Sequence, residues 1–330
     1  MSRMREVSAE TELKNQQAQA ALEADVRSFV LENLPHDRNK IATGAKLEAM
    51  TAKELLSYYL YWLKRIVPPQ PRRVHLSSQI LLNPLFLEYK KAFPKLRDAI
   101  ERGVSLQPYL SNGVAHGYYR HRALKEQRHL DLLLSDWGIH HLHLEKKENP
   151  KENGFGSDHL LFCIFKETDA YLIDIFPHDK PGVWADRALF RIVVENWSKE
   201  NLFGELAVKP ENPEGVSDDL SAARRHIDFR NRGIIVPIEV DGKIYVSSEA
   251  MLGAGIPLSS NIAVDEIWWL TLNFYIQWFE SREGLATKLL ALGAYIHPTE
   301  RPRFHINLDG RFGVTPKSRD ILLALGKVPL

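Results

Sequence analysis

Three histidines stand within four positions of a short apolar stretch, and their type and spacing can carry chemistry. They are His140, His141 and His143 of "GIHHLHLEKK". Because neighbouring side chains of a strand point to opposite faces, a strand here places His141 and His143 on one face and His140 on the other. Two imidazoles on one face can bind a metal ion, exchange protons with a substrate, or lie as polar residues on a half-exposed sheet.

A metal site is one alternative, since a His-x-His pair supplies two ligands of a zinc-type centre. The third ligand would come from neighbouring segments, where the candidates are Asp158, His159, Asp174 and His178. No fixed spacing marks one of the four as that ligand, and the lone Cys163 in "LLFCIF" excludes a thiolate cage. Nucleotide-binding loops, a nucleophile elbow and an H-E-x-x-H helix are missing from the sequence. We therefore predict no metal and no cofactor, and a metal-dependent nuclease stays an alternative.

The segments around the histidines predict a helix followed by an antiparallel meander. Residues 116–138 have a helical pattern, and three strand-like runs follow at 139–144, 159–165 and 170–176. The residues "KETD" between the last two runs are few enough to close a hairpin. The polar, glycine-containing "KENPKENGFGS" predicts a loop between the first two runs.

This stretch, "HHLHLEKK … SDHLLFCIFKETDAYLIDIFPHDK" with the helix before it, resembles the RelE/HigB/ParE superfamily of small bacterial toxins. The resemblance spans residues 115–205 and implies a RelE-like fold, RNA cleavage without a metal, and a role in a bacterial toxin or phage-defence system. Carried over by position, the family's basic and histidine residues fall on His141, His143, His159 and His178. Where the family has arginine this chain has histidine, which is mostly neutral at pH 7 and lacks the bidentate grip on phosphate.

Metal-free cleavage of RNA needs a base for the 2′-hydroxyl proton, an acid for the 5′-oxygen, and a cation over the phosphate. Histidines can share the first two roles because their ordinary pKa lies near ~6.5. The cation can come from Lys146, Lys147, Lys166 or Arg191. We therefore predict the four histidines carried over from the family as the catalytic residues.

The helix before the sheet is rich in basic and aromatic residues, which favours contact with RNA phosphates and bases. Its sequence is "YYRHRALKEQRH", and "ARRHIDFRNRG" is a second basic cluster. The predicted RNA-binding residues are Arg120, Arg122, Lys125, Arg128, Lys146, Lys147 and Arg191. A solvated helix face is the alternative for both clusters. Since the net charge is only +1, contact with nucleic acid would depend on such local patches.

The whole chain is predicted to be an α+β protein with three domains. Residues 1–110 are expected to be helical, with the prolines of "PPQPRR" as a stiff connector. Residues 111–205 are expected to form the RelE-like α+β domain. Residues 206–330 are expected to form a mixed domain with a β-hairpin around "DG", an aromatic helix, a second "DG" turn and a terminal helix.

The aromatic helix at 265–281 supports a different class of function, a non-catalytic nucleic-acid- or protein-binding or assembly protein built on the same fold. Trp268 and Trp278 would then lie in a homo-oligomer or partner interface, while Trp184 and Trp197 are expected as core anchors. The N-terminal residues have no apolar leader, and no window reaches the ~18 apolar residues of a membrane span. We therefore expect a cytoplasmic protein with no membrane partner.

Overall fold

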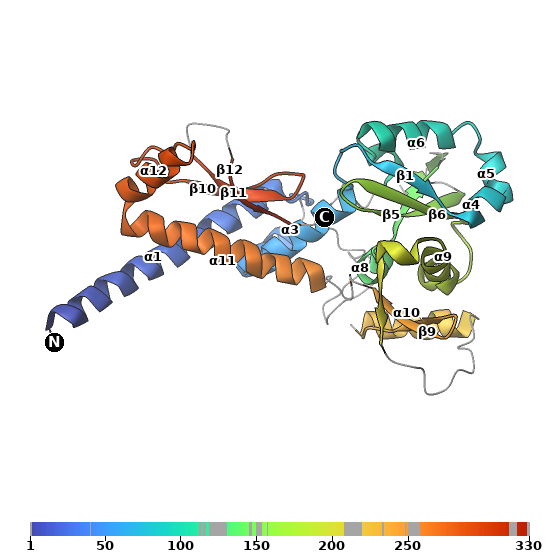
Figure 1. Ribbon diagram of the computed structural model, residues 1–330, viewed down its shortest axis with the longest axis horizontal. Helices are drawn as coiled ribbons and strands as arrows, with labels where there is room; N and C mark the ends of the chain where they lie inside the picture. Colours follow the sequence, from blue (N-terminus) through green and yellow to red (C-terminus); the bar gives the residue numbers. More distant parts are fainter. Residues whose placement is uncertain are drawn as a thin grey trace. The chain divides into compact units, whose positions relative to one another are not determined.

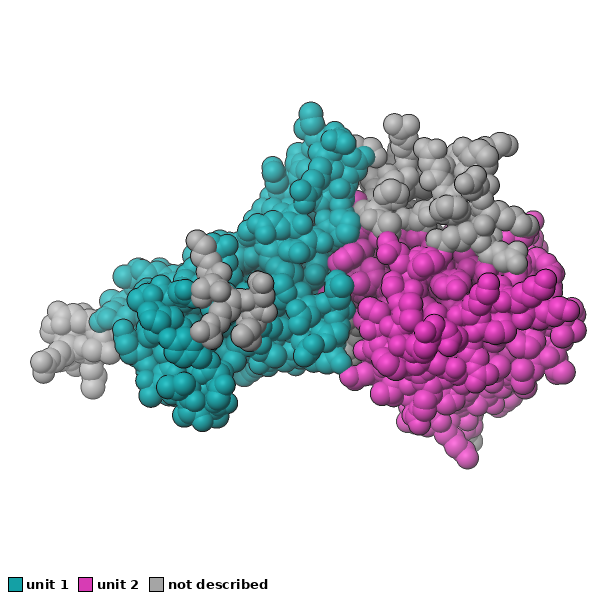
Figure 2. Space-filling model, turned by 90° about the horizontal axis from the view of Figure 1, so that it is seen from above, with its two compact units in different colours: residues 1–60, 261–330 teal, residues 61–260 magenta. Residues whose placement is uncertain are grey.

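Helices and small β-sheets make up the computed structural model of the chain (Figure 1). It describes residues 2–39, 41–111, 114, 117–118, 131–144, 147–149, 154–156, 158–207, 220–232, 234–247, 249, 258–316 and 322–328. The chain divides into two units, residues 1–60 with 261–330 and residues 61–260, which Figure 2 shows in different colours. The predicted α+β class is confirmed.

The first unit consists of helices around a small antiparallel sheet. Its helices are α1 (Ser2–Asn33), α2 (Ile41–Ala49), most of α3 (Ala52–Ile66), most of α11 (Leu258–Glu280) and α12 (Arg282–Ala291). Its strands are β10 (Arg303–Ile306), β11 (Arg311–Thr315) and β12 (Leu323–Lys327), paired in that order.

The core of the first unit forms where α1 meets α3 and the sheet. The ring of Phe29 packs edge-on against Tyr59 and Phe304, at centroid distances of 5.3 and 5.5 Å. The hydroxyl of Tyr275 in α11 donates a hydrogen bond of 2.5 Å to the buried carboxylate of Asp25 in α1. Edge-to-face ring contacts and a hydrogen-bonded buried carboxylate thus hold these helices together.

The second unit contains the sheet that carries the predicted histidines, in the order β1-β6-β5-β2. Strands β2 (His140–His143), β5 (His159–Phe165) and β6 (Asp169–Pro177) are antiparallel neighbours, so the predicted meander is confirmed. β1 (Arg73–Leu76) joins it as a parallel strand beside β6. A separate hairpin, β3 (Lys147–Asn149) with β4 (Gly154–Gly156), lies in the segment predicted as a loop.

Helices cover both faces of this sheet (Figure 1). α4 (Ser78–Leu82), α5 (Pro84–Glu88) and α6 (Phe93–Arg102) cover one face, here called the α6 face, and the 3₁₀ turn η1 (Gln107–Tyr109) follows α6. α8 (Leu132–Trp137) and α9 (Arg187–Trp197) cover the other, here called the α9 face. Because both faces are buried, β5 is apolar at nearly every position, as the run "HLLFCIF" shows.

A second sheet of this unit packs against α9 in the order β7-β9-β8. Its strands are β7 (Phe203–Leu206), β8 (Ile238–Val240) and β9 (Lys243–Ser247). The predicted hairpin between β8 and β9 is confirmed, and Asp241 and Gly242 take the positive φ angles of 50° and 74° that a type I′ turn needs. α10 (Leu220–Asn231) packs against α8 and the 3₁₀ turn η2 (Val183–Ala185), while a further 3₁₀ turn, η3 (Ser198–Glu200), follows α9.

Two predicted elements are wrong. The region before residue 110 is not all helical, because β1 finds its backbone partners in β6 once the prolines at 68–71 have extended the chain. The predicted terminal helix is replaced by β12, which pairs with β11. Gly313 permits this close pairing, since a Cβ there would lie only 2.0 Å from the carbonyl oxygen of Leu323.

The two units also divide the chain at other positions than the predicted boundaries after residues 110 and 205. Both positions fall inside residues 61–260, because β1 pairs with β6 and β7 pairs with β9. Most of the helix predicted at 116–138 lies outside the described residues, and α8 is its last part. Among the helices that the structure describes, none has the length and apolar character to cross a bilayer.

Candidate active site

Strand β2 sets the direction in which each predicted histidine points. His141 pairs with Phe162 and His143 with Leu160, and both partners belong to the core of the α9 face. His140 pairs with Cys163 and points to the α6 face, where its ring packs edge-on against Phe165 at 5.3 Å. The alternation predicted from the sequence therefore separates His140 from the other two histidines of β2.

Asp131 orients His141. It is the N-cap of α8, where its side chain accepts a hydrogen bond of 3.1 Å from the amide of Leu134. Its Oδ2 also lies 3.1 Å from Nδ1 of His141. Burial by itself would raise the pKa of the Asp131 carboxyl, but the charge and hydrogen bond of His141 lower it to about 2. Asp131 is thus ionised at neutral pH and lies beside Nδ1 of the His141 ring.

Trp184 and His178 complete the group on the α9 face. The ring of Trp184 in η2 contacts His141 at a centroid distance of 5.1 Å and His178 at 5.9 Å. The ring of His143 lies 6.1 Å from that of His141 and 6.2 Å from that of His178. Asp131, His141, His143, His178 and Trp184 are called the histidine cluster below. His178 is exposed and His143 is buried, so the cluster reaches from solvent into the core.

The fourth predicted catalytic residue, His159, does not join the histidine cluster. It opens β5, and its Nδ1 lies 2.8 Å from the hydroxyl oxygen of Tyr89, a residue of the core of the α6 face. The structure therefore brings three of the four predicted histidines together and places His159 beside Tyr89. One strand residue decides the face, because His159 and Leu160 are adjacent and point to opposite sides.

Of the seven predicted RNA-binding residues, the structure describes the side chain of one. Arg120, Arg122, Lys125, Arg128 and Lys146 lie outside the described residues, as does the side chain of Lys147 at the start of β3. Arg191 is half-buried on α9. Lys166 lies in the turn between β5 and β6, so its backbone is roughly 13 Å along β5 from the partner of His141 and roughly 30 Å along β6 from His178. Lys166 is therefore badly placed to supply a cation to the histidine cluster.

Sequence reasoning missed Lys180, which lies near the cluster. Its ammonium lies 3.7 Å from the ring centroid of Phe176 and 2.5 Å from Oδ2 of Asp186. Phe176 pairs with Leu160 across β5, and Leu160 pairs with His143 across β2. The spacing "HDK", with the lysine two residues after His178, was the available sign in the sequence.

Sequence reasoning also missed a buried ionic group behind Trp184. The carboxylate of Asp136 in α8 lies 2.9 Å from Nε2 of His226 and 2.9 Å from Nε of Arg230, both in α10. All three residues are buried, and burial lowers the pKa of His226 and of Arg230. Arg230 also donates a hydrogen bond to the carbonyl oxygen of Trp184. This ionic group fixes the backbone that presents the Trp184 ring to the histidines.

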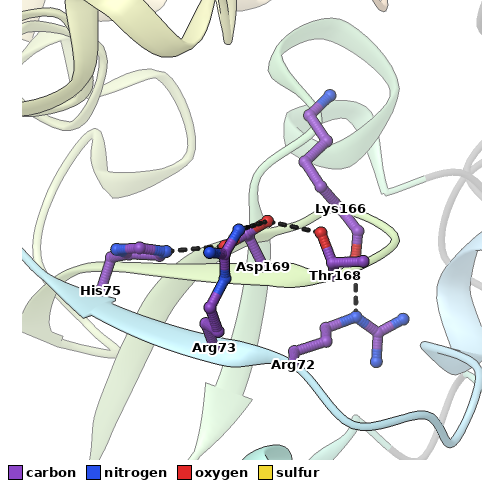
Figure 3. Close-up of polar contacts among 6 residues, drawn as sticks. All are labelled: Arg72, Arg73, His75, Lys166, Thr168 and Asp169. Atoms are coloured by element: carbon purple, nitrogen blue, oxygen red, sulfur yellow. Dashed lines mark hydrogen bonds and ion pairs between the residues drawn. The ribbon is translucent and has the colours of Figure 1, made fainter.

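A second polar group lies at the opposite end of β6, on the edge strand β1 (Figure 3). The carboxylate of Asp169 accepts hydrogen bonds from Arg73 (3.0 Å) and Thr168 (2.6 Å), and it lies 2.8 Å from Nε2 of His75. These bonds, led by that of Thr168, hold the pKa of Asp169 well below its usual range. Asp169, Arg73, His75 and Thr168 are called the Asp169 network below.

A metal site needs at least three ligand side chains close together. In the parts of the chain that the structure describes, no group of three or more His, Cys, Asp or Glu side chains could hold a metal ion. The histidine cluster contains a carboxylate-oriented imidazole, an exposed imidazole and a flat aromatic ring. Such a set can accept a proton at one ring, donate a proton at another, and stack a planar group.

Comparisons with protein-family models, with curated proteins and with solved structures found no match to this chain.

Proposed function

We propose that the protein cleaves RNA by acid–base catalysis at the histidine cluster, without a metal ion. The observation that carries the proposal is the pairing of His141 with Asp131 beside Trp184 and the exposed His178. RNA suits this set because its 2′-hydroxyl is an internal nucleophile that needs only a base, an acid and charge stabilisation.

His141 is the proposed base. Since Asp131 occupies its Nδ1 side, Nε2 of the neutral ring is the nitrogen left to take the 2′-hydroxyl proton. The ionised Asp131 then stabilises the imidazolium that forms, as a buried carboxylate does in other carboxylate–histidine pairs. The 2′-oxygen forms its bond to phosphorus as the bond from phosphorus to the 5′-oxygen breaks. The products are a 2′,3′-cyclic phosphate and a 5′-hydroxyl.

His178 is the proposed acid, because it is exposed and contacts the same tryptophan ring. A protonated His178 would give its proton to the 5′-oxygen as that oxygen leaves. Lys180 is two residues away and can stabilise the phosphate charge. The resemblance of residues 115–205 to the RelE/HigB/ParE superfamily supports the same chemistry and, with it, a role as an effector in a bacterial toxin or phage-defence system.

The test is cleavage of total RNA and of single-stranded DNA by the purified chain, with and without EDTA. RNA cleavage that persists in EDTA and is lost in His141→Ala/His143→Ala is the expected result. Circular dichroism and thermal unfolding of the double variant show whether the fold is intact. Cleavage that requires a divalent metal, or a folded wild-type chain that cleaves neither substrate, would contradict the proposal.

A second proposed function is assembly through α11, which residues 265–281 largely form. Trp269 is 65% exposed and Ile262 is 60% exposed on this helix, seven positions apart and so on one face. Trp278 is buried and Trp268 lies under the ammonium of Lys53, at 5.4 Å from its ring centroid. Trp269→Ala is therefore the variant that tests assembly, by a change in sedimentation, whereas Trp278→Ala would disturb the core of the first unit.

A further inference from the structure

Helix α10 presents two chemically different faces. Its inner face buries Ala222, His226 and Arg230, and the last two form the ionic group with Asp136. Its outer face is exposed and basic, with Arg224 and Arg225 in the helix and Arg232 in the turn that ends it. The exposed and buried positions alternate at the three- to four-residue spacing of an α-helix, so the arginines share one side.

The outer arginines of α10 have no carboxylate partner among the described residues. Arg225 donates a hydrogen bond of 2.9 Å to the hydroxyl of Ser221 in the same helix, and this uncharged partner leaves the charge of Arg225 in place. Asp228 is the one acidic residue on this face of α10, so the described residues of the face carry two more positive than negative charges. Phe229 is 41% exposed beside them. Guanidinium groups that have no carboxylate partner among the described residues, next to an exposed ring, suit a ligand that alternates phosphates with flat bases.

The inner face connects this basic surface to the histidine cluster. Arg230 donates to the carbonyl oxygen of Trp184, and the Trp184 ring contacts His141 and His178. Asp136, which holds Arg230, belongs to the six-residue helix α8 whose N-cap is Asp131. A nucleic-acid strand bound to the outer face of α10 would thus be separated from the proposed catalytic rings by the width of α10.

We propose that the outer face of α10, formed by Arg224, Arg225, Phe229 and Arg232, binds the phosphate backbone of single-stranded nucleic acid and guides it to the histidine cluster. The destination of the strand rests on the proposed function, whereas the binding itself does not. Phosphate contacts position a strand without reading its sequence, so binding is expected to depend on salt and little on base identity.

The test is the fluorescence anisotropy of a labelled 12-nucleotide 2′-O-methyl oligouridylate, which has no free 2′-hydroxyl and cannot be cleaved by the proposed reaction. Arg224→Gln/Arg225→Gln/Arg232→Gln in the full chain should weaken binding at least tenfold. The slope of log affinity against log salt should become shallower by roughly 2, because each of the three lost phosphate contacts on a single strand contributes about 0.7 to it. Asp228→Asn should tighten binding, since it removes the acidic residue of the face.

The matched control is Lys90→Gln/Lys91→Gln/Lys95→Gln, which removes the same charge from exposed residues around the start of α6. It should leave affinity within twofold of the wild type. Equal losses in both triple variants, or no binding by the wild-type chain, would overturn the proposal. Binding that depends on α10 without any cleavage of RNA would leave it standing and contradict the proposed ribonuclease. Cleavage of RNA that the α10 variant does not slow would overturn the α10 proposal alone.

Discussion

An aspartate–histidine contact lies near each end of β6, and the two contacts have different surroundings. At the start of the strand, His75 meets Asp169, and at its end the histidine cluster contains His141 with Asp131. Asp169 is also bonded to the hydroxyl of Thr168 and to the exposed Arg73, whose positive charge offsets that of the carboxylate. Asp131 holds one imidazole and a helix amide, next to a tryptophan and two further histidines. An aspartate–histidine contact therefore supports a proposal of catalysis only where other reactive groups surround the imidazole.

The buried ion pair of Arg230 with Asp136 should contribute far more to stability than the exposed pair of Arg73 with Asp169. Arg230→Ala leaves the buried carboxylate of Asp136 with His226 as its one remaining partner among the described residues. Removing one partner of a buried pair costs about 3–5 kcal/mol because an uncompensated charge remains. Urea unfolding of the full chain, followed by tryptophan fluorescence, should show this loss. An unchanged midpoint would mean that the Asp136 charge is solvated in the native state.

Acid should destabilise the second unit through the histidine on the opposite face. Burial lowers the pKa of His140 to about 3, from an ordinary value near ~6.5. The unfolded chain then binds a proton between these two values that the folded chain does not, so stability falls as the pH drops below ~6.5. By pH 4 the loss from this group is about 3 kcal/mol. His140→Leu should flatten the dependence of unfolding free energy on pH in this range, and an unaltered profile would refute the assignment.

Asp131→Asn should remove a smaller contribution to the free energy of unfolding, which comes from a charged carboxylate and not from a neutral imidazole. The folded pKa of Asp131 is about 2 and the ordinary value is 3.8. Its charge thus stabilises the fold by about 2 kcal/mol above pH 4, and that stabilisation is lost as the pH falls from 3.8 to 2. Asparagine still caps α8, so the comparison isolates the charge. Unfolding free energies measured at pH 7 and pH 2.5 should differ less in the variant than in the wild type.

Arg73→Ala should have the smallest effect of these changes. The side chain of Arg73 is 76% exposed, and exposed ion pairs contribute little because solvent screens them. The urea midpoint should stay within experimental error of the wild type, beside the large shift of Arg230→Ala. A comparable shift in the two variants would show that the Asp169 network is needed to keep β1 on the sheet.

The fold could be predicted from sequence where local rules decide it. The alternation of His140, His141 and His143 and the turn at Asp241 and Gly242 depend on neighbours within a few residues. β1 could not be predicted in this way, because its partner Asp169 follows Arg73 by 96 positions. β12 was missed for a different reason, since an apolar run alone does not distinguish a helix from a strand.

The candidate site was predicted only in part. Its histidines could be found from their spacing, but the sequence did not separate His159 from the others, because a one-residue difference in strand position reverses the face. Asp131 was identifiable as an N-cap before "LLLSDWG", yet its contact with His141 depends on how the helix returns to the strand. Trp184 was expected in the core, and its ring contacts with His141 in β2 and Phe162 in β5 depend on the turn η2, which the sequence did not predict.

The most direct test of the account is RNA cleavage in EDTA by two matched variants, His141→Gln and His75→Gln. Each removes an imidazole that is paired with an aspartate, one from the histidine cluster and one from the Asp169 network. General acid–base groups contribute about 10²–10⁴ to a rate, so His141→Gln should lose at least a hundredfold while His75→Gln stays within twofold. Equal rates in the two variants, or a loss confined to His75→Gln, would contradict the assignment of catalysis to the histidine cluster.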